Sequence, residues 1–217
     1  MPVFSACHSN SMSVFIHSLH IYPIKSCQGI ALHEAELTDT GFSYDRHWML
    51  VDRQGQFLTQ RQYPRLARVQ TELNADELIV GSDGRQQLQL PLRSNDSERR
   101  EVQVWNDRCS AAVVSQQANH WFSDYLDMHC ELVFLPESEQ RRVDPDYALA
   151  RQIVGFADGF PLLVLSRASI DLLNSKLPQK VDINRFRPNI VIDGCHAHAE
   201  DEWSGITVNH IDIQFAK

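Results

Sequence analysis

The sequence has few cysteines and no CxxC pair. Its five cysteines are an odd number without regular spacing: Cys7, Cys27, Cys109, Cys130 and Cys195. A disulfide scaffold or a zinc ribbon needs paired cysteines, so the sequence argues against both. Reduced thiols are typical of a cytoplasmic protein, which is the localisation we predict.

Long apolar runs and excess positive charge are also missing. No run approaches the roughly 18 apolar residues of a membrane span, and residues 1–13 lack the basic start and apolar core of a secretory signal. We interpret residues 1–13 as a flexible tail and expect no membrane partner. The formal net charge of −8 argues against nucleic-acid binding, because phosphate backbones are bound mainly by cationic surfaces. If the chain binds an anion, its positively charged side chains must therefore be clustered at one place.

What the sequence does contain is a series of short β-rich segments about ten residues apart, which is typical of a barrel or sandwich. They are expected at 14–21, 46–51, 57–60, 67–73, 77–80, 86–90, 102–105 and 131–135. An amphipathic helix follows Ser115, with its core face at helical spacing: Ala118, Trp121, Phe122, Tyr125 and Leu126. We predict a mixed α/β, mainly β fold.

The charged segment after Pro136 marks a predicted boundary between a β-barrel-like domain at 14–136 and a second domain at 137–217. In the second domain we expect a buried strand at 161–165 and a helix capped by Ser166. One or two strands between 206 and 215 end the pattern.

An arginine string precedes one of these strands. Arg185 and Arg187 flank Phe186, and Pro188 favours an extended residue before it. If the string is extended, both arginines lie on one face, where guanidinium groups suit phosphate or carboxylate. The alternative is that both pair with the chain's many carboxylates.

Two further cations stand out near the start. Lys25 lies in a turn-like segment where its charge, a hydroxyl and backbone donors could converge on an anion. Arg46 follows a turn and opens a strand. The alternatives are a solvated lysine and an exposed salt bridge of about 1 kcal/mol at most.

Five ordered motifs carry a resemblance to a known family: Tyr22–Cys27, Asp45–Val51, Thr59–Leu66, Phe156–Leu163, and Asn184–Gly194 followed by Ala199–Trp203. Together they resemble the MOSC family, the molybdenum-cofactor sulfurase C-terminal domains, preceded by its N-terminal β-barrel domain. The pattern is similar to bacterial MOSC reductases and the mitochondrial amidoxime-reducing component.

The resemblance implies that the phosphate and pterin of molybdopterin lie between the two domains. Lys25, Ser26 and Arg46 would supply one half of the site, and Ser166 and Arg167, at a helix start, would approach the cofactor. Arg185 and Arg187 would close the other side, with the choice between them open. The intact protein would be a molybdenum-cofactor oxidoreductase that reduces N-hydroxylated compounds, with an iron–sulfur or haem protein as electron donor.

The family's metal ligand is a cysteine thiolate after the last strand, and the 217 residues offer no counterpart. Cys195 lies too early for this role, and Cys27 suits a structural one. His196 and His198 lie beside acidic residues but lack a third ligand at defined spacing. We therefore assign no catalytic or metal-binding residue, and expect a C-terminally incomplete chain whose cofactor is absent or incomplete.

Whether the chain is an enzyme stays open at this point. One alternative is a non-catalytic module that binds the pterin phosphate or a protein. Another is a sulfur carrier or transferase, which would also need the missing cysteine. Pyridoxal phosphate binding, a property associated with the family, is not expected here.

Overall fold

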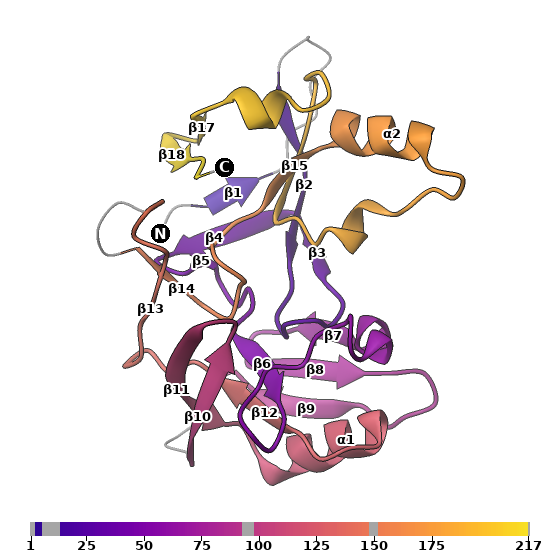
Figure 1. The fold of residues 1–217 in the computed structure, drawn as a ribbon, viewed down its shortest axis with the longest axis vertical. Helices are drawn as coiled ribbons and strands as arrows, with labels where there is room; N and C mark the ends of the chain where they lie inside the picture. The colour runs from indigo at the N-terminus through magenta and orange to yellow at the C-terminus, as the bar shows by residue number, and fades with distance from the viewer. Residues whose placement is uncertain (1–2, 6–13, 93–97, 148–151, 217) are drawn as a thin grey trace.

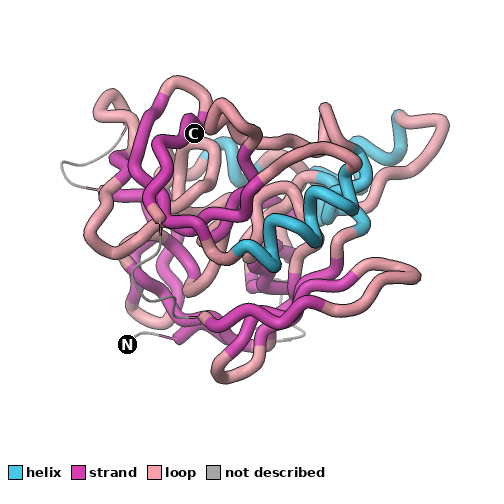
Figure 2. Tube along the Cα trace, turned by 90° about the horizontal axis from the view of Figure 1, so that it is seen from below, coloured by secondary structure: helices cyan, strands magenta, loops and turns pink. Residues whose placement is uncertain are grey.

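The computed structural model describes residues 3–5, 14–92, 98–147 and 152–216. Strands dominate these residues, which confirms the predicted mixed, mainly β fold (Figures 1 and 2). The strands are β1 Val3–Ser5, β2 Phe15–Ile21, β3 Ile30–Leu32, β4 Glu34–Thr38, β5 Gly41–Phe42, β6 Trp48–Val51, β7 Gln70–Leu73, β8 Glu77–Gly81, β9 Leu88–Pro91, β10 Arg99–Val104, β11 Asp107–Val113, β12 Glu131–Phe134, β13 Arg141–Arg142, β14 Ile153–Val154, β15 Val164–Ser166, β16 Ile190–Asp193, β17 Gly205–Val208 and β18 Ile211–Gln214. The helices are α1 Gln116–Leu126 and α2 Arg167–Lys176, with 3-10 turns η1 Pro64–Arg68, η2 Ile183–Arg185 and η3 Ala199–Glu202.

The chain folds into two lobes (Figure 1). The lower lobe holds β6 to β12 and α1, with sheet orders β10-β11-β12-β6 and β7-β8-β9. The upper lobe holds α2 and the sheet β15-β16-β2-β3. This upper sheet joins distant parts of the sequence, because β2 pairs antiparallel with β16, and β16 pairs parallel with β15.

The predicted aromatic helix is confirmed as α1. Ser115 is its N-cap, and the Ser115 hydroxyl accepts a hydrogen bond from the amide of Ala118 at 3.1 Å. Phe122 is fully buried against the lower sheets, and burial of such a side chain contributes about 1.5–3 kcal/mol. The helix face therefore closes the core of the lower lobe.

Several sequence-based expectations were wrong. The segment 161–165 is not a buried strand: only its last two residues belong to β15, and Leu163 is 44% exposed. The reason is that β15 lies at the edge of its sheet. Residues 57–60 form only an isolated bridge between Phe57 and Val51. The strand β11 was not predicted at all.

The predicted domain limits stay a prediction. Strand β2 falls in the predicted first domain and β16 in the second, yet they share one sheet. Within the predicted tail, β1 pairs with β4, and residues 1–2 and 6–13 lie outside the described part of the chain.

Candidate functional site

The arginine string does not enter its strand extended. Arg185 belongs to η2, whose N-cap is Asp182, and Arg187 has a left-handed φ of 57°. The expectation that both arginines share one face of an extended segment is therefore wrong. The bias imposed by Pro188 is overridden because tertiary contacts hold Arg187 on both its backbone and its side chain.

These contacts join Arg187 to the N-terminal motifs. Its Nη1 donates to the carbonyl of Cys27, while its own carbonyl accepts from Nη2 of Arg46 at 2.7 Å. Its Nη2 is buried and has no hydrogen-bond partner among the residues that the structure describes. Burial and the nearby Arg46 charge lower the pKa of Arg187 to about 10. A buried guanidinium nitrogen without an acceptor is an unmet demand for an anion or a polar ligand.

Arg46 is buried, so the alternative of an exposed salt bridge is wrong. Its Nη1 donates to Asp45 at 2.5 Å and to the side-chain oxygen of Asn189 at 2.8 Å. Asn189 also accepts from the amide of Leu163 and donates to the carbonyl of His20. One buried amide side chain therefore ties Arg46 to both β2 and the edge strand β15.

The Tyr22 ring contacts both arginines. The guanidinium carbons of Arg46 and Arg187 lie 4.4 Å and 4.3 Å from the centre of the Tyr22 ring, at distances that favour cation–π attraction. Burial raises the pKa of Tyr22 to about 12, so the ring stays neutral. A Cβ on Gly29 would lie 2.5 Å from the ring, so glycine is needed there to make room.

Lys25 provides a third cation in this region. Its side chain is 9% exposed, and its ammonium donates to the carbonyl of Phe156 at 2.7 Å and to Asp158 at 2.6 Å. Burial lowers its pKa to about 8, against the opposing attraction of Asp158. An ammonium has three donors, so one donor remains beyond these two bonds. Because Lys25 is buried, the alternative of a solvated lysine is wrong.

The other predicted site residues are placed differently. Ser26 is buried beside Lys25, with its hydroxyl donating to the carbonyl of Leu58. Arg185 is exposed on η2. Ser166 and Arg167 lie at the carboxyl end of β15, about 10 Å along the strand from the end beside Asn189.

Internal groups occupy the start of α2. Ser166 caps the helix by accepting from the amide of Ser169, and Glu200 accepts from the amide of Ser166 and the hydroxyl of Ser169. Arg167 pairs with Asp193 at 2.6 Å. A binding role for Ser166 and Arg167 stays a prediction.

Backbone strain coincides with the predicted site. Ser26, Arg46 and Arg187 have φ values of 73°, 45° and 57°. Each left-handed non-glycine residue costs on the order of 1–3 kcal/mol and persists where its surroundings hold it in place. Six further non-glycine residues in the described ranges also have a positive φ, so backbone strain by itself does not identify the site.

The thiols show no sign of reactivity. Burial raises the pKa of Cys27 to about 12 and of Cys109 and Cys130 to about 11, and the pKa of Cys195 is also raised. Cys7 lies outside the described residues. No cluster of three or more potential metal ligands occurs in the described ranges.

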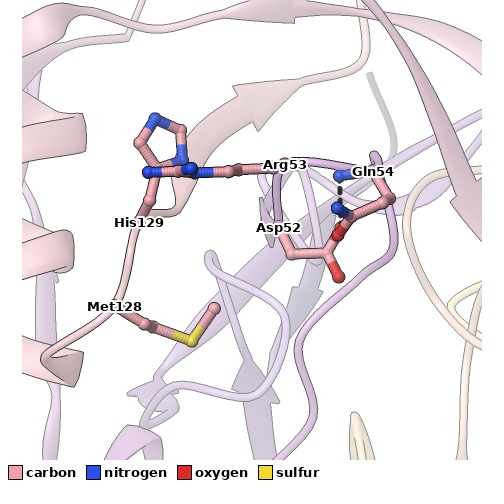
Figure 3. Close-up of a pocket in the computed structure, with 5 residues that line it drawn as sticks. All are labelled: Asp52, Arg53, Gln54, Met128 and His129. Carbon is pink, nitrogen blue, oxygen red and sulfur yellow. Dashed lines mark hydrogen bonds between the residues drawn. The ribbon is translucent and has the colours of Figure 1, made fainter.

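A shallow pocket lies elsewhere in the lower lobe (Figure 3). It is lined by Asp52, Arg53, Gln54, Met128 and His129. Asp52 follows β6 and already accepts from the amides of Gln54 and Gln56, whereas Arg46 precedes β6 at its other end. The pocket is therefore separate from the Lys25 and Arg187 region.

Sequence reasoning missed Tyr22, Asp45, Asn189 and Asp158, although all four lie inside the motifs that carried the resemblance. Asp45 precedes Arg46 directly and Asn189 lies two residues after Arg187, which was a usable signal, whereas Asp158 has no candidate cation near it in the sequence. Trp105, which donates to Asp158 at 2.9 Å, gave no signal in the sequence.

Arg46 and Arg187, which are far apart in the sequence, lie over one aromatic ring, and guanidinium groups are chemically suited to anions. Comparison with known proteins gives the family. The MOSC N-terminal beta barrel domain matches residues 13–129 and the MOSC domain matches residues 151–217. The chain belongs to the MOSC family.

Three relatives illustrate the range of similar proteins. Mitochondrial amidoxime-reducing component 1 of Mus musculus is 34% identical over 208 residues, 92% of this chain and 61% of the relative. Its Homo sapiens counterpart is 31% identical, over 92% of this chain and 62% of the relative. Molybdenum cofactor sulfurase of Solanum lycopersicum is 31% identical, over 89% of this chain and 26% of the relative.

The chain thus spans only part of the length of these relatives. None of the helices in the described ranges is long and apolar enough to cross a membrane. The predicted cytoplasmic localisation stays a prediction, and the names of the amidoxime-reducing relatives place those proteins in mitochondria.

Proposed function

We propose that this chain binds the molybdenum cofactor by the phosphate of its pterin, using Lys25, Arg46 and Arg187. The observation that carries the proposal is the buried, unpartnered Nη2 of Arg187. The other two cations are each paired with a carboxylate, Arg46 with Asp45 and Lys25 with Asp158. Arg187 has no carboxylate bonded to its guanidinium in the described part of the chain, so one positive charge is left for an anion.

The described residues fit the phosphate end of the cofactor. Arg187 offers a charge-assisted donor, which gives the stronger kind of hydrogen bond to phosphate, and Lys25 has one donor left. The metal end requires a thiolate, and the described cysteines carry raised pKa values. When bound, the cofactor would supply a molybdenum centre for exchange of electrons and oxygen with a substrate.

The name of the sulfurase relative contains this cofactor, which supports cofactor binding for this chain. For the intact protein we propose a reductase of N-hydroxylated compounds, on the likeness to the amidoxime-reducing components. Such a reductase would take its electrons from an iron–sulfur or haem protein. Sulfur transfer is less well supported, because a transferase needs a reactive thiol.

The test is pterin content after production in a host that makes the cofactor. Oxidised pterin is quantified by fluorescence in the wild-type chain, Arg187→Ala and Arg185→Ala. Loss of a buried charge-assisted bond should lower retention about 10–100-fold, whereas the exposed Arg185 should matter little. Absence of pterin from the wild type, or equal retention in both variants, would contradict the proposal.

A further inference from the structure

Trp105 has an unusual backbone for its residue type. Residues Val104 and Asp107 pair at the end of the β10–β11 hairpin, so Trp105 and Asn106 form a two-residue loop. Only Trp105 of this pair has a positive φ, at 53°. The first position of such a loop then favours glycine, so a bulky aromatic residue there is strained. Strain of this kind clusters at functional sites.

Its side chain is exposed yet fixed. The residue is 46% exposed, while its indole N–H donates to Asp158 at 2.9 Å. Asp158 is itself held, because its carbonyl accepts from the buried Arg141 at 3.0 Å. Arg141 also binds the carbonyls of Gly155 and Ala157. The indole therefore points its polar edge at a rigid acceptor and leaves a ring surface open to solvent.

The ring also lies next to the Lys25 ammonium. The same Asp158 oxygen accepts from Trp105 and from Lys25. Phe57 connects the pair, with its ring centre 5.0 Å from that of Trp105 and 5.3 Å from the Lys25 nitrogen. A ligand whose anionic group reaches the free donor of Lys25 would have its adjoining atoms beside the indole.

We propose that Trp105 is a specificity-determining residue that selects anions carrying a planar conjugated ring, by stacking its exposed indole on that ring. The inference rests on the proposed function for its anion, and it adds the class of ligand. Offset or edge-to-face aromatic contacts favour such a ring over an alkyl group.

The test compares phenyl phosphate with methyl phosphate on the cofactor-free chain by calorimetry, with loss of indole fluorescence as a second readout. In the wild type, phenyl phosphate should bind about 2–10-fold more tightly. In Trp105→Ala the ratio of the phenyl phosphate affinity to the methyl phosphate affinity should fall to about one, because the methyl phosphate affinity stays unchanged and the gain from the ring is lost. Trp121→Phe is the matched control, because that indole lies on α1 and donates to the carbonyl of Gln86, so this variant should keep the ratio of the two affinities.

The outcomes separate the two claims. Equal affinity for both probes in a wild type whose binding is lost in Lys25→Met would overturn the role of Trp105 and leave the proposed function standing. Binding of both probes that survives Lys25→Met, or no binding at all, would overturn both. Pterin retention in Trp105→Ala identifies which ligand carries the ring. Reduced retention assigns the ring to the cofactor. Unchanged retention, together with equal affinities for phenyl phosphate and methyl phosphate, assigns it to a substrate.

Discussion

Arg187 and Tyr22 are packed with the guanidinium carbon 4.3 Å from the ring centre, and the arginine keeps one buried nitrogen without a partner. Arg46 contacts the same ring at 4.4 Å. The ring holds two like charges in fixed places that repulsion would otherwise separate. The geometry of the candidate site therefore depends on a side chain that need not touch the ligand.

Gly29→Ala tests this dependence. The added Cβ would lie 2.5 Å from the Tyr22 ring, so the ring must shift, at a cost of about 1–3 kcal/mol. We expect lower stability in urea denaturation and weaker phosphate binding. Gly81→Ala, where a Cβ would meet its nearest neighbour at 3.7 Å, is the control. Unchanged phosphate affinity in Gly29→Ala would show that the ring does not position the arginines.

Lys25 should give binding and stability opposite pH dependences. Its folded pKa is about 8, below the ordinary 10.5, so the unfolded chain binds more protons between these values. The Lys25 contribution to the free energy of unfolding therefore rises with pH from about 8 to 10.5. Phosphate binding that needs the charged ammonium should instead weaken above about pH 8, approaching tenfold per unit.

The free energy of unfolding and the phosphate affinity are both measured between pH 7 and 10, with Lys25→Met as the reference. Subtracting the reference removes the titration of other groups. A phosphate affinity that is flat to pH 10 in the wild type would show that Lys25 is not a ligand.

Asn189→Leu should be among the more damaging substitutions. It removes the acceptor for Arg46 and Leu163 in a residue that is 1% exposed, leaving buried donors unpaired. We expect a loss of about 2–4 kcal/mol in urea denaturation. Asn74→Ala, an exposed turn residue that accepts from two amides, should cost about 1 kcal/mol or less. Similar losses in both would argue against a special role for Asn189.

The sequence predicted the elements whose signals are local. Ser115 and Ser166 were found as helix caps because a cap needs only a side-chain oxygen and the amides that follow. Lys25, Arg46 and Arg187 became candidates because their motifs resemble those of a family, and their binding role stays a prediction. The left-handed conformation of Arg187 was not predicted, because it depends on Cys27 and Arg46, which lie 160 and 141 residues away. Pro188 by itself favours an extended conformation for Arg187.

The described thiols predict a low molybdenum content. With the pKa of Cys27 at about 12 and those of Cys109 and Cys130 at about 11, the thiolate that binds such a metal is scarce at neutral pH. Elemental analysis of the purified 217-residue chain should give well below one molybdenum per chain. A stoichiometric value would contradict this prediction, and loss of the metal in Cys195→Ser would then identify a cysteine ligand.

We propose that Arg187, and not Arg185, completes an anion site with Lys25 and Arg46. The decisive measurement is calorimetric titration of the cofactor-free chain with inorganic phosphate. Arg187→Ala should weaken binding about 10–100-fold, Arg187→Lys should weaken it less because the charge stays while the fork is lost, and Arg185→Ala should change it by less than about threefold. Equal affinities across the wild type and all three variants, in chains with unchanged unfolding curves, would contradict the claim.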